Sequence, residues 1–453
     1  MKRRDFLKIS GAAAAVLPLA AGCAEGGALC NKLIGRASRG SGKSSDGASL
    51  QGEMPCNYEG VGLLGYGCMR WPMADAEQGT IDQQTVNALV DEALAHGVNY
   101  FDTSPVYLQG KSEEATAIAL NRHPRSEWLL ATKLSNFSDA SYDNSVLMYR
   151  RSLEIFRTDH IDYYLLHSIS GAASFRKRFA ETGIMDFLLS ERKAGHIRNL
   201  GFSFHGPESG LDELLELHAA YHWDFVQIQM NYEDWNNAGG RNADASYLYS
   251  KLAELDIPVV IMEPLRGGAL AGIPAPLAAR LKEREPSRSI ASWAFRFCGS
   301  FPKVLTILSG MENADHLRDN LHTFLDFKPL TEEETGFLDA VGAEIAQYPL
   351  VGCTGCQYCM PCPYGIDIPG IFRFYNNCVN EGTYVKSPEQ KDYARARRRY
   401  LATYDKAVQT ARQADHCISC GICQRSCPQH IRIPRELKRI DSYIEQLKRG
   451  ELQ

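Results

Sequence analysis

The chain has 453 residues, 44% of them hydrophobic, and its 49 lysines and arginines against 54 aspartates and glutamates give a formal net charge of −5. This composition is that of a globular protein and excludes collagen-like, coiled-coil and wholly disordered chains. The charge balance, without a basic groove interleaved with aromatic residues, gives no reason to expect nucleic acid as a partner, and we expect none. The 14 cysteines are unusual, because eight of them fall in two short runs near the C-terminus, as metal ligands do.

The first 30 residues are expected to be an export signal. Arg3 and Arg4 precede Phe6-Leu-Lys8, and an uncharged stretch runs from Ile9 to Gly22. That stretch is shorter than the roughly 20 residues that a membrane-spanning helix needs. The pattern resembles the twin-arginine signal, which exports folded proteins, so we expect the protein in the periplasm or on the outer face of the cell membrane. The alternative is a basic tail on a buried helix.

The segment after the apolar stretch leaves two outcomes open. Leu19-Ala-Ala-Gly-Cys23 resembles a lipobox whose leucine lies one position early, so either Cys23 carries a lipid anchor or the signal is simply cleaved. Residues 31–56, rich in glycine and serine between 37 and 50, are expected to form a flexible linker.

Eight apolar, β-rich runs alternate with longer amphipathic stretches between residues 57 and 330. The runs are 61–66, 100–102, 129–133, 163–167, 199–202, 225–229, 259–262 and 304–308. The stretches between them have helical periodicity, as in residues 85–96, where Val86, Leu89 and Val90 share one face. Eight such units predict a (β/α)8 TIM barrel, whose active site lies at the C-terminal ends of its strands. An open doubly wound sheet is the alternative, but the glycine-rich turn that it needs after its first strand is absent.

Four polar side chains follow three of the predicted strands. Asp102 and Tyr107 follow the second, Lys133 ends the third and His167 ends the fourth. A carbonyl that accepts a hydride also needs a proton, which Tyr107 would donate if Lys133 lowers its pKa and Asp102 keeps that lysine charged. His167 would hydrogen-bond the carbonyl oxygen. Taken singly, these residues also fit a structural ion pair, a packed loop aromatic and a core histidine.

This quartet resembles that of the aldo-keto reductase family, as do the segments Leu64-Gly-Tyr-Gly-Cys-Met-Arg70 and Gly195-His-Ile-Arg-Asn-Leu-Gly-Phe-Ser203. The resemblance covers the whole barrel segment. It implies an enzyme that interconverts a carbonyl and an alcohol in a small molecule with NAD(P)H. It further implies that Ser203 and Gln227 lie at the nicotinamide end of the cofactor and Asn320 at the adenine end.

The cofactor positions also depart from the family pattern. Phe204 stands where the family has an asparagine, and Met262 stands where an aromatic residue often stacks on the nicotinamide. Glu312 follows the eighth strand, where it would repel the 2′-phosphate of NADPH. A preference for NADPH is therefore not supported, and NADH, or a weakened or absent nicotinamide site, stays open.

The two cysteine runs are expected to form an iron–sulfur domain over residues 353–440. They comprise Cys353, Cys356, Cys359 and Cys362, and then Cys417, Cys420, Cys423 and Cys427. The second run has the bacterial ferredoxin spacing, in which the fourth cysteine ligates the other cluster. By that crossing rule one [4Fe–4S] cluster takes the first three cysteines with Cys427, and a second takes the next three with Cys362. The first run has two residues rather than three before Cys362, so one cluster remains open as well as two.

Zinc prefers two separated pairs of cysteines, and consecutive C-x₂-C spacings form strained disulfides, so iron–sulfur clusters fit better. The runs resemble the small, mainly α-helical two-cluster ferredoxin module that follows the barrel in one branch of the aldo-keto reductases. Residues 331–352 would form a connecting helix and linker, and residues 441–453 a C-terminal tail. The cysteines outside the runs are expected in loops or the core, among them Cys30, Cys56, Cys68, Cys298 and Cys378.

A basic helical stretch at 391–400 is either a solvated face or a surface that steers an acidic redox partner. Hydride transfer moves two electrons and a cluster moves one, and reduced nicotinamide is scarce outside the cytoplasm. We therefore expect an exported oxidoreductase in which the clusters relay electrons to or from the barrel. The alternative is an electron-transfer protein whose barrel is a binding or docking scaffold with a decayed nicotinamide site, and a third reading makes the clusters structural.

Overall fold

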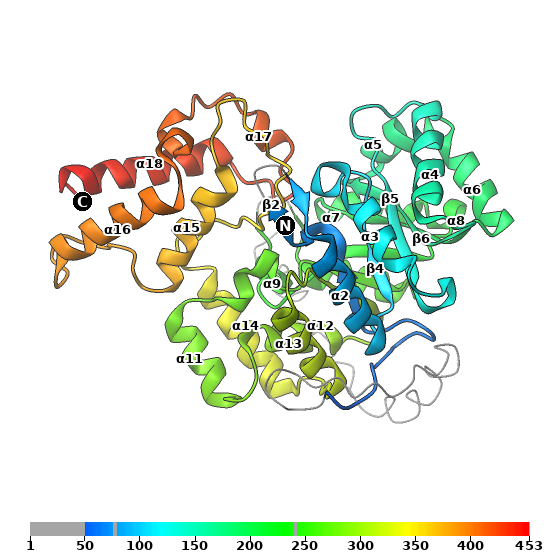
Figure 1. Cartoon of the computed structure of the whole chain (residues 1–453), viewed down its shortest axis with the longest axis horizontal. Coiled ribbons are helices and arrows are strands. Elements are labelled where there is room, and N and C mark those ends of the chain that lie inside the picture. The colour runs from blue at the N-terminus through cyan, green and yellow to red at the C-terminus, as the bar shows by residue number, and fades with distance from the viewer. Residues whose placement is uncertain (1–49, 76–78, 240–241, 453) are drawn as a thin grey trace, which may run out of the picture.

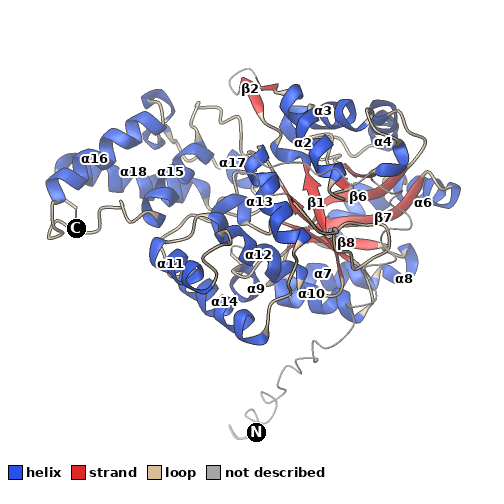
Figure 2. Ribbon diagram, turned by 60° about the horizontal axis from the view of Figure 1, so that its bottom comes forward, coloured by secondary structure: helices blue, strands red, loops and turns tan. Residues whose placement is uncertain are grey.

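The computed structural model describes residues 50–75, 79–239 and 242–452. Eight parallel strands close into a barrel in the order β1-β10-β9-β8-β7-β6-β5-β4. Figures 1 and 2 show the labelled strands with helices around them. The strands are β1 (Leu64–Gly67), β4 (Tyr100–Asp102), β5 (Leu129–Leu134), β6 (Ile161–Ile169), β7 (Ile197–Phe204), β8 (Phe225–Gln229), β9 (Val259–Met262) and β10 (Val304–Ser309). The closed barrel confirms the predicted TIM barrel.

The predicted strands agree with the structure in number and order, and differ at some ends. β6 and β7 are longer than predicted, and β1 begins at Leu64 rather than Val61. Val61 instead pairs with Tyr58 in an isolated bridge, where its N–H donates to the Tyr58 carbonyl at 3.2 Å. A two-stranded hairpin of β2 (Met73–Asp75) and β3 (Thr80–Ile81) follows β1.

Helices surround the strands because their apolar faces pack on the outside of the barrel (Figure 2). They are α2 (Gln83–Ala95), α3 (Ser112–Leu120), α4 (Tyr142–Phe156), α5 (Ala172–Phe175), α6 (Ile184–Ala194), α7 (Glu208–Glu216), α8 (His218–Tyr221), α9 (Asp234–Asn237), α10 (Ala245–Glu254), α11 (Ala275–Arg284), α12 (Ile290–Gly299), α13 (Ala314–Leu325) and α14 (Glu332–Ile345). Helix α2 shows how a capping residue and an apolar face form such a helix. Asp82 caps it by accepting from the Thr85 N–H at 3.1 Å, while Val86, Leu89 and Val90 are buried.

The chain after Leu350 forms a second domain with a hydrophobic core of its own. Its helices are α15 (Ile368–Asn380), α16 (Tyr393–Ala407), α17 (Ile422–Arg425) and α18 (Ile433–Arg449). In Figure 1 helices α15, α16 and α18 extend to the left of the barrel, and α17 lies nearer to it. This arrangement agrees with the predicted small, mainly α-helical domain.

Two predicted boundaries differ from the structure. Helix α14 was expected in a connecting segment, but Leu338, Val341 and Ile345 pack in the barrel's core. Residues 441–453 were expected to be a tail, but most of them continue α18, and Tyr443 and Leu447 are buried in the second core. Both differences have one cause, because an amphipathic helix at a domain edge lowers its free energy by burying its apolar face. In the described part of the chain, no helix is long and apolar enough to cross a membrane.

Candidate active site at the barrel mouth

The four polar residues singled out in the sequence meet at the C-terminal end of the barrel. Asp102 ends β4, and Lys133 and His167 lie near the ends of β5 and β6. Tyr107 opens the short helix η2 (Tyr107–Gly110) that follows β4. This helix contains Leu108 in the left-handed region, at φ 50°.

Lys133 and Asp102 form a fully buried ion pair. The lysine Nζ donates to Asp102 Oδ1 at 2.6 Å and to the Thr103 carbonyl at 2.7 Å, and the two side chains are 1% and 4% exposed. Burial raises the pKa of Asp102 and lowers that of Lys133, and each charge partly offsets the effect of burial on the other. The Lys133 Nζ also lies 4.8 Å from the centre of the Tyr107 ring. The cation is thus positioned to stabilise negative charge on that phenol.

The pKa of the Tyr107 phenol is shifted in the direction opposite to the predicted one. The sequence predicts that Lys133 lowers its pKa, whereas the structure shows the pKa raised well above the ordinary value, mainly by burial and then by the charges of Tyr358 and Asp102. The expectation was wrong because it counted the lysine charge and omitted the desolvation of the phenolate. Tyr107 therefore keeps its proton at neutral pH, which is the form that a proton donor requires.

His167 is buried and held by hydroxyl groups. Its Nδ1 lies 2.6 Å from Ser135 Oγ and 3.3 Å from Ser104 Oγ. Burial, followed by the positive charges of Lys133 and Arg178, lowers the pKa of His167 well below its ordinary value. The ring is therefore neutral at pH 7 and presents Nε2 toward the mouth of the barrel.

Tyr358 from the second domain reaches this site, which the sequence did not predict. Its hydroxyl lies 3.4 Å from His167 Nε2 and is hydrogen-bonded to the Tyr107 phenol. Tyr358 stands between Cys356 and Cys359 in the first cysteine run. Its hydroxyl thus occupies the point on which Tyr107 and His167 converge. The position of Tyr358 between two cysteines does not predict this contact, because the contact depends on how the two domains pack.

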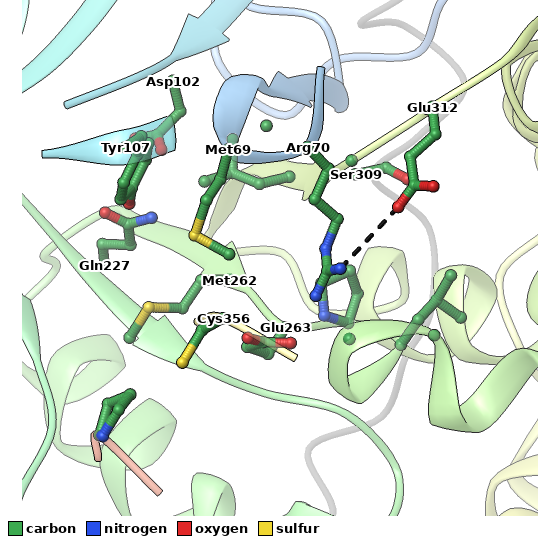
Figure 3. A pocket seen from close by; sticks show the side chains of 18 of the residues that line it. Met69, Arg70, Asp102, Tyr107, Gln227, Met262, Glu263, Ser309, Glu312 and Cys356 are labelled. Carbon is green, nitrogen blue, oxygen red and sulfur yellow. Dashed lines mark ion pairs between the residues drawn. The ribbon is translucent and has the colours of Figure 1, made fainter. Parts of the chain in front are cut away.

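A cavity of about 520 Å³ opens beside the quartet, within the size range of small-molecule sites. Figure 3 shows its walls, with Tyr107 and Gln227 on one side and Arg70 and Glu312 on the other. The three residues expected to hold a nicotinamide cofactor all line it: Ser203, Gln227 and Asn320.

The cofactor residues fit a nicotinamide at one end of this cavity better than an NADPH phosphate at the other. Gln227 is 2% exposed, and its Oε1 has no hydrogen-bond partner among the described residues, so it can accept from a carboxamide. Asn320 donates to Ser309 Oγ at 2.8 Å. Glu312 lies 3.8 Å from the Arg70 guanidinium, which the sequence left without a role. This ion pair, dashed in Figure 3, places a carboxylate on the cavity wall after the eighth barrel strand, where the sequence analysis expects the 2′-phosphate of NADPH.

Hydrogen bonds join the second domain to the barrel around this cavity. Arg70 also donates to the Thr354 carbonyl, and Gln229 and Gln429 exchange two hydrogen bonds at 3.3 and 2.9 Å. Gly267, at φ 67°, lets the chain near Thr354 approach, since a Cβ at Gly267 would meet the Thr354 carbonyl at 2.0 Å. The loop that carries the first cysteines is therefore a wall of the active-site cavity.

The structure groups the eight cysteines into the two sets that the crossing rule expects. A small cavity of about 20 Å³ is lined by Cys353, Cys356, Cys359 and Cys427. Cys423 interacts electrostatically with Cys417, Cys362 and Cys420. Cys362 therefore lies in the second set despite the shorter gap before it. Among the cysteines outside the runs, Cys68, Cys298 and Cys378 are buried, whereas Cys30 lies outside the described residues.

The buried thiol set beside the barrel fits an iron–sulfur cluster. Burial raises the pKa of Cys356 to about 12 and also raises the pKa values of Cys353 and Cys427. Four neighbouring thiolates in a buried site raise the free energy of the folded state unless a bound metal compensates their charge. Among the described residues no three or more His, Cys, Asp or Glu side chains are placed to bind one metal ion. A four-iron cluster takes its thiolates at four separate irons, hence at a wider spacing.

Comparison with known proteins agrees with this geometry. The model of the aldo/keto reductase family matches residues 63–343. The chain belongs to the aldo/keto reductase family. A 4Fe-4S dicluster domain matches residues 352–433, so this aldo/keto reductase also carries an iron–sulfur domain.

The curated relatives span the barrel. The uncharacterized oxidoreductase YqkF of Bacillus subtilis is 24% identical over 311 residues, which cover 60% of this chain and 90% of that protein. An aldo-keto reductase of Mycolicibacterium vanbaalenii is 25% identical over 281 residues, covering 62% and 88%. This family and these relatives make the chain an oxidoreductase.

Among solved structures, an aldo-keto reductase from Bacillus halodurans in its holo form is 22% identical, with a TM-score of 0.51, and covers 64% of this chain and 96% of that one. An aldo-keto reductase from Klebsiella pneumoniae, solved with NADPH, is 20% identical, with the same TM-score, and covers 64% and 95%. At such identities the likeness shows the shared fold.

Proposed function

We propose that this aldo/keto reductase interconverts a carbonyl and an alcohol in a small molecule, with Tyr107 as the proton donor, and that two [4Fe–4S] clusters relay electrons to or from its barrel. One observation carries the proposal. A single cavity is lined by Tyr107 and Lys133 from the barrel and by Cys356 and Tyr358 from the second domain. A cluster at Cys356 would thus lie beside the site of carbonyl chemistry.

The proton chemistry follows from the residues around Tyr107. A carbonyl oxygen between Tyr107 and His167 accepts hydrogen bonds from both and gains the Tyr107 proton as negative charge develops on it. The Lys133 cation, 4.8 Å from the Tyr107 ring, then stabilises the phenolate. Asp102 holds that lysine in place and offsets its desolvation.

Tyr358 must move for this reaction to occur. Its hydroxyl occupies the point where the carbonyl oxygen would bind, because it already contacts both Tyr107 and His167. We include in the proposal that substrate displaces the Tyr358 hydroxyl from this point. The same contact favours the alternative function, in which the barrel is a scaffold whose catalytic point is permanently filled.

NADH is the nicotinamide cofactor that the cavity suits best. When bound, it would supply hydride to the carbonyl carbon. Ser203 and Gln227 would hold its carboxamide end and Asn320 its adenine end, while the Glu312 carboxylate beside Arg70 disfavours a 2′-phosphate.

The eight cysteines would hold the two clusters, each of which exchanges one electron at a time. Two clusters together have the capacity for the two electrons of one hydride. One set, with Cys356, borders the cavity, whereas Cys420 of the other set is exposed. One set thus borders the cavity, and the other reaches the surface of the second domain.

The test compares Tyr107→Phe with Tyr100→Phe in the holoenzyme. Tyr100 is fully buried, and its hydroxyl has no hydrogen-bond partner among the described residues. Removing this hydroxyl is therefore a control that makes the same substitution away from the proton donor. With NADH and a panel of small aldehydes, Tyr107→Phe should lower turnover about 10²- to 10⁴-fold, and Tyr100→Phe should not. Iron content and visible absorbance should stay unchanged in both. Equal turnover in wild type and Tyr107→Phe would remove Tyr107 as the donor. No turnover of any aldehyde by wild type that binds its clusters would favour the scaffold alternative.

We propose, on the sequence alone, that the protein is exported through the twin-arginine route. Arg3, Arg4 and Cys23 lie outside the described residues. Replacing both arginines with lysine should retain the protein in the cytoplasmic fraction, and secretion of that variant at the wild-type level would refute the proposal. Mass spectrometry of the mature N-terminus distinguishes a lipidated Cys23 from simple cleavage.

A further inference from the structure

Exposed apolar side chains gather around one of the two cysteine sets. Nine large hydrophobic residues are exposed in the described part of the chain, and three of them are Tyr364, Ile418 and Ile422, at 47%, 60% and 50% exposure. Each lies within two positions of a cysteine in the set formed by Cys362, Cys417, Cys420 and Cys423. Such grouping is uncommon on a surface, where single apolar residues are usually scattered.

The same set also reaches the surface. Cys420 is exposed, whereas Cys427 of the other set is buried. The other set borders the barrel cavity through Cys356. The apolar residues thus surround the cysteine set that reaches solvent, and not the set that borders the cavity.

Positive charge borders this apolar patch. Arg425 follows Ile422 by three positions in α17, so both side chains lie on one side of that turn. The Arg412 carbonyl accepts from the Asp367 N–H at 3.0 Å, which places Arg412 beside the loop that carries Tyr364. Both arginines are exposed, and neither has an ion pair with any described residue.

Arg412 and Arg425 thus place two positive charges beside the patch. Asp415 is the exposed acidic residue nearest to it in sequence, and its charge acts on Asp441 and Lys448 of α18. The basic stretch of α16 adds little here, because Figures 1 and 2 both place α16 well apart from α17.

We propose that Tyr364, Ile418 and Ile422, with Arg412 and Arg425 beside them, form the docking surface for an acidic electron-carrier protein. The small apolar centre fits a transient partner, since redox encounters bury little area. The arginines attract a negatively charged protein and orient it over Cys420. In the transfer, one electron leaves the reduced carrier and one enters the cluster; no bond forms or breaks.

The inference rests on the part of the proposed function that assigns clusters to the cysteines, and it is independent of Tyr107. The experiment uses the cluster-loaded full chain and a fully reduced flavodoxin, a small acidic flavoprotein, as the probe. Stopped-flow absorbance gives the second-order rate constant of cluster reduction. Dithionite, a small reductant that needs no docking surface, is used in parallel.

Three variants sharpen the test. Arg425→Glu and the pair Ile418→Ser with Ile422→Ser alter the patch, and Leu147→Ser with Leu255→Ser removes exposed leucines elsewhere as a control. The patch variants should reduce the rate with flavodoxin about tenfold or more, while the leucine control and all rates with dithionite stay at the wild-type value. The wild-type rate should fall as salt rises.

Four outcomes would overturn the proposal. The first is an unchanged flavodoxin rate in the patch variants, and the second is a wild-type rate that rises with salt, which indicates repulsion. The third is a wild-type dimer in sedimentation that the isoleucine variants dissociate, which would make the patch an interface between copies of this chain. A chain that dithionite cannot bleach holds no reducible clusters, and this result would refute the cluster assignment together with the docking surface.

Discussion

Removing the Lys133 amine while keeping Asp102 should destabilise the barrel severely. In Lys133→Met the carboxylate loses the donor 2.6 Å from its Oδ1. Its Oδ2 has no hydrogen-bond partner among the described residues. The side chains are 1% and 4% exposed, so water cannot replace the lost charge. Breaking a buried pair in this way costs about 3–5 kcal/mol.

The paired variant separates stability from catalysis. Lys133→Met with Asp102→Asn leaves no buried charge, so it should regain most of the lost free energy of unfolding and remain within about 1–2 kcal/mol of wild type. Turnover should not recover, because the cation beside Tyr107 is still missing. Both variants should therefore show activities lowered by about 10²- to 10⁴-fold.

Urea denaturation followed by tryptophan fluorescence measures these free energies. The five tryptophans at positions 71, 128, 223, 235 and 293 all lie within the barrel, so the signal reports its unfolding separately from the second domain. A loss below about 1 kcal/mol in Lys133→Met would contradict a buried, ionised pair. Recovery of turnover in the double variant would contradict the role given to the lysine.

Three further predictions concern the interface between the domains and the barrel mouth. Burial lowers the pKa of His205 from 6.5 to about 4, so its contribution to stability is present above pH 6.5 and is lost as pH falls toward 4, by about 3 kcal/mol in all. Fluorescence-monitored unfolding at pH 7.5 and 5 should show about 2 kcal/mol of this loss, and His205→Gln should remove it; an equal loss in the variant would show that His205 is not its cause. Cys427→Ser should remove about half of the bound iron while Cys378→Ser retains all of it, as measured by iron analysis, and full iron in Cys427→Ser would exclude that ligand. Tyr358→Phe removes a competing hydroxyl worth about 1 kcal/mol, so the KM for aldehydes should fall several-fold at constant kcat; a large fall in kcat would instead make Tyr358 the proton donor.

The fold and the quartet could be predicted because both depend on local signals. Apolar runs of strand length, separated by amphipathic stretches, fix the order of barrel strands, and residues at strand ends must meet at one rim. The chain order of the ligand cysteines likewise carries the crossing pattern of a two-cluster domain. Asp102, Lys133 and His167 therefore lie where the sequence places them.

What the sequence could not supply depends on how the domains pack. Nothing in the first cysteine run indicates that Tyr358 reaches His167, because this contact is set by the fit of a loop against the barrel mouth. The raised pKa of Tyr107 was missed for a related reason, since burial is a property of the assembled site. The extension of α18 into the expected tail was missed because its apolar face is stabilised by the core that it covers, and the sequence does not show that core.

An anaerobic titration with NADH of the protein lacking residues 1–23 shows whether the barrel and the clusters share electrons. Nicotinamide fluorescence and visible cluster absorbance are followed in one cuvette, with NADPH as the comparison. NADH should bind more tightly than NADPH, and its addition should bleach the clusters. Clusters that dithionite reduces but NADH leaves unchanged, with no nicotinamide bound, would contradict this expectation and favour the scaffold alternative.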